Sequence, residues 1–166
     1  MNLYLLRHAE AIDHAKTDAA RYLTEKGVSQ AKTVGRFCRD NGIAPDVILT
    51  SSYCRAEQTA QIVAAKIGSK VVVAPFLGSG MQPGEAIKEL DAYPNLASVM
   101  LVGHEPDFSH FAATLLGLPE SRRLNLRKAS LTLLALEHPG PGSATLEFIL
   151  PVKLMGSKMK RPKHFP

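Results

Sequence analysis

Short apolar runs of strand length alternate with segments of helical periodicity along this chain. The runs cover residues 3–6, 47–49, 71–73 and 99–102, and within each one the apolar residues are consecutive. Consecutive Leu, Val and Ile residues are typical of strands that are covered on both faces, as in a parallel sheet. The alternation therefore predicts an α/β fold, a three-layer α/β/α sandwich around a mostly parallel central sheet of about six strands.

Capping residues and glycines mark the helices that we expect between these runs. We expect helices between Thr24 and Gly42, from about residue 55 to Gly68, over about 85–93, and from Pro106 to Leu116. Two further apolar segments, 131–136 and 145–150, flank the turn Pro139-Gly140-Pro141-Gly142. Because these two strands follow each other directly, we expect them to form an antiparallel hairpin at the edge of the sheet.

The charge of the chain is concentrated at its C-terminal end. The 166 residues carry a net charge of +5, yet residues 153–166 hold five Lys and Arg residues and no acid. Fifteen basic and fifteen acidic residues then remain in the body. We therefore expect one domain over residues 1–152, followed by a basic tail over 153–166 that is either a solvated end or a binding segment. The body gives no indication of nucleic acid binding.

Hydropathy and the cysteines restrict the class of protein further. No apolar run approaches the ~20 residues of a membrane span, and the N-terminus has no signal-peptide pattern. We therefore expect a cytoplasmic protein that binds no membrane. Two cysteines, Cys38 and Cys54, are too few for a disulfide framework. A cysteine-dependent phosphatase loop needs Arg six positions after the Cys, and Ala44 and Ala60 stand there instead.

Three of the expected strands are followed by basic or imidazole side chains. Arg7 and His8 end the first apolar run, Arg55 follows the second, and His104 follows the fourth. Parallel strands end at a common edge of the sheet, where α/β proteins bind their ligands. The sequence therefore predicts that these four residues converge on one pocket.

Two arginines and two histidines around one point are suited to a phosphoryl group and its transfer. The guanidinium fork matches pairs of phosphoryl oxygens. A neutral imidazole can attack phosphorus through its free ring nitrogen and form a covalent phosphohistidine. A second imidazole can donate to the oxygens on which charge develops in the transition state. This chemistry needs no metal or other cofactor, and a phosphate or sulfate ion is the expected occupant of the pocket.

The motifs that carry these residues resemble those of a known family. Leu6-Arg7-His8-Ala9-Glu10, the segment from Ser51 to Ala60, and Val102-Gly103-His104-Glu105-Pro106 are similar to the three motifs of the histidine phosphatase superfamily, the phosphoglycerate-mutase-like group. The small size and the segment from Asp18 to Thr24 resemble its SixA-type phosphohistidine phosphatases. The resemblance covers about residues 2–150. It implies His8 as the nucleophile, Arg7, Arg55 and His104 as the phosphate pocket, and a contact from Arg21 to the phosphoryl group.

The chain departs from the family pattern at two places. Ala9 stands where the signature has Gly, which is tolerated if the backbone stays out of left-handed space. Larger members carry an acidic proton donor between Arg55 and His104, and the corresponding segment 77–85 lacks their Glu-rich pattern. Glu85 is a poor candidate for the donor. An alkoxide leaves badly without a proton, whereas imidazole is readily protonated, so this departure favours phosphohistidine over sugar phosphates.

The sequence therefore predicts a metal-independent phosphatase that dephosphorylates phosphohistidine on a signalling protein of a phosphorelay. Two alternatives stay open: a small-molecule phosphomonoesterase of the same superfamily, and a non-catalytic phosphate-binding module. Arg21 could instead be a surface ion-pair partner. Lys128, before the hairpin, could either reach an anion or lie exposed.

Overall fold

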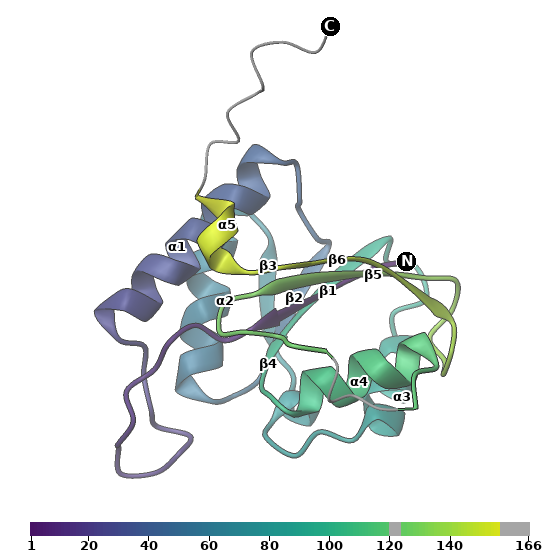
Figure 1. The fold of residues 1–166 in the computed structure, drawn as a ribbon, viewed down its shortest axis with the longest axis horizontal. Helices are drawn as coiled ribbons and strands as arrows, with labels where there is room; N and C mark the ends of the chain where they lie inside the picture. Colours follow the sequence, from purple (N-terminus) through teal and green to yellow (C-terminus); the bar gives the residue numbers. More distant parts are fainter. Residues whose placement is uncertain (120–123, 157–166) are drawn as a thin grey trace, which may run out of the picture.

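The computed structural model describes residues 1–119 and 124–156. It shows a six-stranded sheet with helices on both faces (Figure 1). The strands are β1 (Asn2–Arg7), β2 (Val47–Thr50), β3 (Lys70–Val73), β4 (Ser98–Gly103), β5 (Leu131–Leu136) and β6 (Ala144–Leu150). The helices are α1 (Glu25–Asp40), α2 (Cys54–Ile67), α3 (Pro83–Asp91), α4 (Asp107–Leu116) and α5 (Val152–Met155), with a 3-10 turn, η1 (Pro75–Leu77). This architecture confirms the predicted fold class.

The order of the strands is β3-β2-β4-β1-β5-β6. The first four are parallel to one another, β5 is antiparallel to β1, and β6 is antiparallel to β5. The predicted hairpin is thus confirmed, and it supplies the antiparallel edge. The order also makes β1 and β4 the central neighbours, so the segments after these two strands lie side by side.

Local signals in the sequence explain where the helices begin and end. The Thr24 hydroxyl accepts a hydrogen bond from the backbone N–H of Gly27 at 3.0 Å, which caps the start of α1. Gly68 ends α2 with φ of 76°, a left-handed conformation that glycine adopts without strain. Two starts differ slightly from the prediction: α3 begins at Pro83, and Pro106 caps α4 instead of lying in its first turn.

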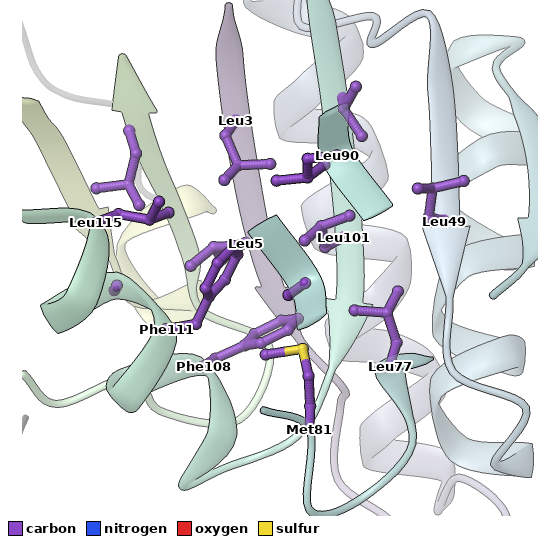
Figure 2. Packing of buried hydrophobic residues seen from close by; sticks show 14 of the residues in the cluster. Leu3, Leu5, Leu49, Leu77, Met81, Leu90, Leu101, Phe108, Phe111 and Leu115 are labelled. Carbon is purple, nitrogen blue, oxygen red and sulfur yellow. The ribbon is translucent and has the colours of Figure 1, made fainter. Parts of the chain in front are cut away.

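The central strands β1 and β4 are buried on both faces. Leu3 and Leu5 of β1 pack with Leu101 of β4 against Phe108 and Phe111 of α4 and against α3 (Figure 2). The alternate residues of the two strands form a second cluster with α1 and α2 on the other face; in β1 these are Tyr4 and Leu6. The consecutive apolar residues of these strands thus reflect a layer of helices on each side.

The C-terminal part of the described chain packs on α1. Val152 and Met155 of α5 contact the cluster between the sheet and α1, so residues 153–155, which we counted with the tail, lie in a helix. The rest of the predicted basic tail, 157–166, lies outside the described residues. None of the helices in the described part of the chain combines the length and the apolar character that crossing a membrane requires.

Candidate active site

The residues predicted to converge meet beyond the carboxyl ends of β1, β2 and β4. Arg7 pairs with Gly103 in the β1–β4 register, and the backbone N–H of His8 donates to Gly103 O at 3.0 Å. This pairing places His8 beside His104, and their ring centroids are 5.3 Å apart. Arg55 is the second residue of α2, which follows the carboxyl end of β2, and its side chain contacts His8. His8, Arg55 and His104 are 7%, 5% and 3% exposed.

The two ring nitrogens of His8 have different partners. Nδ1 lies 2.7 Å from the carbonyl oxygen of Ala9, which can only accept a hydrogen bond, so Nδ1 carries the proton. Nε2 lies 3.3 Å from Nε of Arg55, which can only donate. The lone pair of the neutral imidazole is therefore on Nε2, the nitrogen that faces the guanidinium group of Arg55.

Burial keeps both imidazoles neutral. It is the largest cause that lowers the pKa of His8 to about 3, with smaller contributions from His104, Arg55 and Arg7, against the opposing effect of the bond to Ala9. Burial, followed by the charge of Arg55, lowers the pKa of His104 to about 4. At neutral pH His8 is thus an uncharged imidazole beside two cationic side chains.

His104 is oriented by the loop that follows β2. Its Nε2 lies 2.9 Å from Oγ of Ser51, and this hydroxyl also accepts a hydrogen bond from Tyr53 N–H at 3.2 Å. The Tyr53 ring packs beside the imidazole with centroids 4.9 Å apart, and its centroid lies 5.0 Å from Cζ of Arg55. Ser51 and Tyr53 belong to the second motif, but we assigned them no role from the sequence.

Two buried nitrogens in this site have no hydrogen-bond partner among the described residues. They are Nδ1 of His104 and Nε of Arg7, whose Nη1 donates to Leu126 O at 2.9 Å. Buried polar atoms are nearly always paired, so such a pair of nitrogens calls for an explanation. A ligand with several acceptor oxygens would satisfy both.

Asp18 contacts both Arg55 and Arg21. Its backbone and carboxylate oxygens accept hydrogen bonds from Arg55 at 2.7 and 3.0 Å, and its other carboxylate oxygen pairs with Nη1 of Arg21 at 2.8 Å. Hydrogen bonds from Arg21 and Arg55 hold the pKa of Asp18 below its usual value. Arg21 is also fixed by Ile12 O at 2.6 Å. The carboxylate of Asp18 therefore lies between the guanidinium groups of Arg21 and Arg55.

The backbone after β1 is held in place by α2. The N–H of Ala9 donates to Oγ1 of Thr59 at 3.1 Å, and this hydroxyl donates to Arg55 O at 2.7 Å. Ala9 is fully buried, and among the described non-glycine residues positive φ occurs at Ala129. Alanine is therefore compatible with the backbone at the signature position, as we expected. Asp18, Thr59 and Ser51 are supporting residues that reading the sequence did not identify.

Carboxyl groups lie around the site without contacting its histidines. Glu85 is exposed in the first turn of α3. Burial raises the pKa of Glu105, which follows His104 and accepts a hydrogen bond from Ser109. Among the described residues, no carboxylate is hydrogen-bonded to His8 or His104. Residues 1–119 and 124–156 contain no group of three or more His, Cys, Asp or Glu side chains that could hold a metal ion.

Comparisons of sequence agree with this arrangement. A model of the histidine phosphatase superfamily (branch 1) matches residues 3–78. An uncharacterized protein of Picosynechococcus sp. is 34% identical over 140 residues, covering 79% of this chain and 82% of its own length. The serine/threonine-protein phosphatase Pgam5, mitochondrial, of Drosophila grimshawi is 27% identical over 198 residues, covering 96% of this chain and 68% of its own length.

Solved structures share the fold. The SixA protein of Agrobacterium tumefaciens superposes with a TM-score of 0.78 at 26% identity, covering 90% of this chain and 97% of that one. The protein histidine phosphatase SixA complexed with tungstate gives a TM-score of 0.84 at 23% identity, with coverages of 93% and 99%. With its buried histidine pair between arginines, its family match and these neighbours, the chain belongs to branch 1 of the histidine phosphatase superfamily.

Proposed function

We propose that this protein is a phosphohistidine phosphatase, in which His8 is the nucleophile and the substrate is a phosphorylated signalling protein. The observation that carries the proposal is the state of His8. This imidazole is buried and neutral, its Nδ1 proton is fixed by Ala9, and its Nε2 lone pair faces Arg55. A nucleophile with this tautomer is ready to attack phosphorus without first losing a proton.

In the first step, Nε2 of His8 forms a bond to phosphorus while the bond from phosphorus to the substrate nitrogen breaks. The electron pair of that bond stays with the leaving imidazole, which takes a proton and departs neutral. The proton of His8 stays on Nδ1, which donates it in a hydrogen bond to the carbonyl oxygen of Ala9, and this contact stabilises the positive charge that the phosphorylated ring acquires. In the second step, water attacks phosphorus, the bond from phosphorus to Nε2 breaks, and its electron pair returns to Nε2. Hydrogen phosphate is released, and the second proton of the water goes to solvent.

The surrounding cations stabilise the phosphoryl group during both steps. Nε of Arg7 has no partner among the described residues and can donate to a phosphoryl oxygen. The Ser51 hydroxyl already accepts from Tyr53, and its hydrogen can be donated to Nε2 of His104. In that tautomer Nδ1 of His104 carries a proton for an equatorial oxygen. Arg55 beside Nε2 of His8 supplies a third donor. A further contact from Arg21 to the phosphoryl group is part of this proposal.

The leaving group distinguishes the two candidate classes of substrate, phosphomonoesters and phosphohistidine. A phosphomonoester leaves as an alkoxide and gains much from a positioned acid, and in the described structure no carboxyl group is hydrogen-bonded to the histidine pair. The ring of a phosphohistidine takes up a proton from solvent on its other ring nitrogen near neutral pH, so it leaves as a neutral imidazole without such help. The likeness to SixA structures supports the same substrate. The name of the Pgam5 relative favours a protein phosphoester as the second candidate.

Two peptides of identical sequence, one phosphorylated on histidine and one on serine, test the proposal. A general acid contributes about 100-fold or more to such a reaction, so kcat/KM should be at least about 100-fold higher for the phosphohistidine peptide. The wild type should turn over many equivalents of this peptide, and His8→Asn should release no phosphate. Equal rates on the two peptides would contradict the substrate assignment. Binding without turnover would identify a phosphate-binding module instead.

A further inference from the structure

A groove of about 490 Å³ is lined in part by Arg7, the residue before His8, and five of the residues that line it are basic. Its walls come from the start of α1, the segment before β5, and α5. The basic residues of the groove are Arg7, Lys26, Arg127, Lys128 and Lys153. The other lining residues are Gln30, Pro151 and Val152, so no acidic side chain of the described residues lines the groove.

Most of this positive charge is not neutralised by the described part of the chain. Lys26 is paired with Glu10, whose carboxylate lies 2.7 Å from its ammonium group. Among the described residues, Arg127, Lys128 and Lys153 form no ion pair, and all three are exposed. Over residues 1–152 as a whole, acidic and basic residues are balanced in number. The groove is therefore a local concentration of positive charge, and a cleft lined by one sign of charge focuses the electrostatic field.

The position of the groove links it to the phosphoryl site. Arg7 lines the groove, directly precedes His8, and its charge contributes to the lowered pKa of both histidines. A molecule whose phosphoryl group lies on His8 would therefore have its neighbouring atoms close to Arg7 and the groove. The exposed cations of the groove would then meet the part of the substrate that surrounds the phosphorylated residue.

We propose that this groove binds acidic side chains that flank the phosphohistidine of a protein substrate, so that it selects among phosphorylated proteins by charge. This inference rests on the proposed function, and it adds what that function leaves open, the surface chemistry of the partner. Lysines on three separate elements with exposed side chains match an extended acidic protein surface. A small polyanion would require buried, converging donors. Complementary charges at such a rim raise the rate of association and make it dependent on salt.

Charge reversal in the groove, compared with reversal elsewhere, tests the proposal. Lys128→Glu with Lys153→Glu changes two exposed groove residues, and Lys70→Glu with Lys88→Glu changes two exposed lysines on β3 and α3 by the same net charge. The probes are two synthetic peptides with a central histidine, one flanked by Asp and Glu and the other by Asn and Gln. Fluorescence anisotropy of the unphosphorylated peptides measures binding without turnover, and phosphate release from the phosphorylated forms measures kcat/KM.

The wild type should bind the acidic peptide and cleave its phosphorylated form about tenfold better than the amide peptide at low salt. Lys128→Glu with Lys153→Glu should lose this preference while it keeps its rate on the amide peptide. The control pair should keep the preference.

Equal affinity of the wild type for the two unphosphorylated peptides would contradict the proposed role of the groove. The same loss of preference in the control pair would also contradict it. Tighter binding to phosphatidylserine vesicles than to the acidic peptide would also overturn it. Binding of the acidic peptide without phosphate release would refute the proposed function and leave the groove standing.

Discussion

At the scale of single residues, the state of the site depends on which groups contact the two ring nitrogens of His8. A carbonyl oxygen on Nδ1 and a guanidinium group on Nε2 permit one neutral tautomer, and burial opposes any added charge. The same burial acts on His104. Both histidines are therefore held neutral by the fold, and this has a consequence for stability as well as for catalysis.

The free energy of unfolding should fall as the pH is lowered below 6.5. In the folded state the pKa of His8 is about 3 and that of His104 about 4, whereas both take up a proton near pH 6.5 when the chain unfolds. The unfolded state then binds more protons, so stability rises with pH across this window. Each histidine contributes a slope of about 1.4 kcal/mol per pH unit. Urea denaturation between pH 4.5 and 8 measures it.

The variant His8→Asn isolates this effect. Between about pH 4.5 and 6, the free energy of unfolding of the variant should change less steeply with pH than that of the wild type, by about 1.4 kcal/mol per pH unit, which is what one histidine contributes. The slopes of the variant and the wild type should coincide between pH 7 and 8, where neither state of the protein gains a proton on these rings. An unchanged slope in the variant at acidic pH would show that His8 is not held neutral in the folded state.

The ion pairs of Asp18 are a feature of the site that could not be predicted from the sequence at this scale. The four strand-end residues were predicted because their types and positions are unusual for strand ends. The ion pairs that join Asp18 to Arg21 and Arg55 depend on how the segment between β1 and α1 folds back. That segment has no periodicity from which its path could be predicted.

At the scale of elements, the start of α1 fixes the segment that follows His8. The backbone N–H of Thr24 donates to Glu10 O at 3.0 Å, and Gly27, one helical turn further on, packs directly against that same carbonyl group. A Cβ atom at residue 27 would overlap the oxygen of Glu10, which is backbone and has little freedom to move.

Gly27→Ala should therefore destabilise the protein by about 1–3 kcal/mol, the usual cost of overpacking a well-packed site. Gly84→Ala is the matched control, because Gly84 also lies in the first turn of a helix and a Cβ atom there meets nothing within 4 Å. The control should be neutral or more stable by up to about 1 kcal/mol, since alanine favours helix. Urea denaturation of both variants provides the comparison. A Gly27→Ala protein as stable as Gly84→Ala would contradict this packing.

Most of the helices and strands could be predicted from the sequence, and their arrangement could be predicted in part. Thr24, Gly68 and the apolar runs mark local structure by local chemistry, so the structure confirms them. The starts of α3 and α4 shifted by one or two residues because a proline suits both the cap and the first turn. The strand order could not be predicted, because the apolar runs are alike and nothing in them specifies which strands pair.

At the scale of the whole molecule, one topological rule accounts for the site. Parallel strands end at one edge, and the order β2-β4-β1 makes three such ends adjacent, so residues 7, 8, 55 and 104 meet although they are far apart in the chain. The site could therefore be predicted from the sequence. The basic groove could not, because its lysines and arginines come from four segments, β1, α1, the segment before β5 and α5, and nothing in the sequence indicates that these lie together.

The most direct test of the central claim is the position of the covalent phosphoryl group. The protein would be mixed with a radiolabelled phosphohistidine peptide, quenched in alkali, digested and mapped. The account predicts an acid-labile, alkali-stable label on the peptide that contains His8, absent from His8→Asn. Label on His104, or no label in a protein that turns the peptide over, would contradict it.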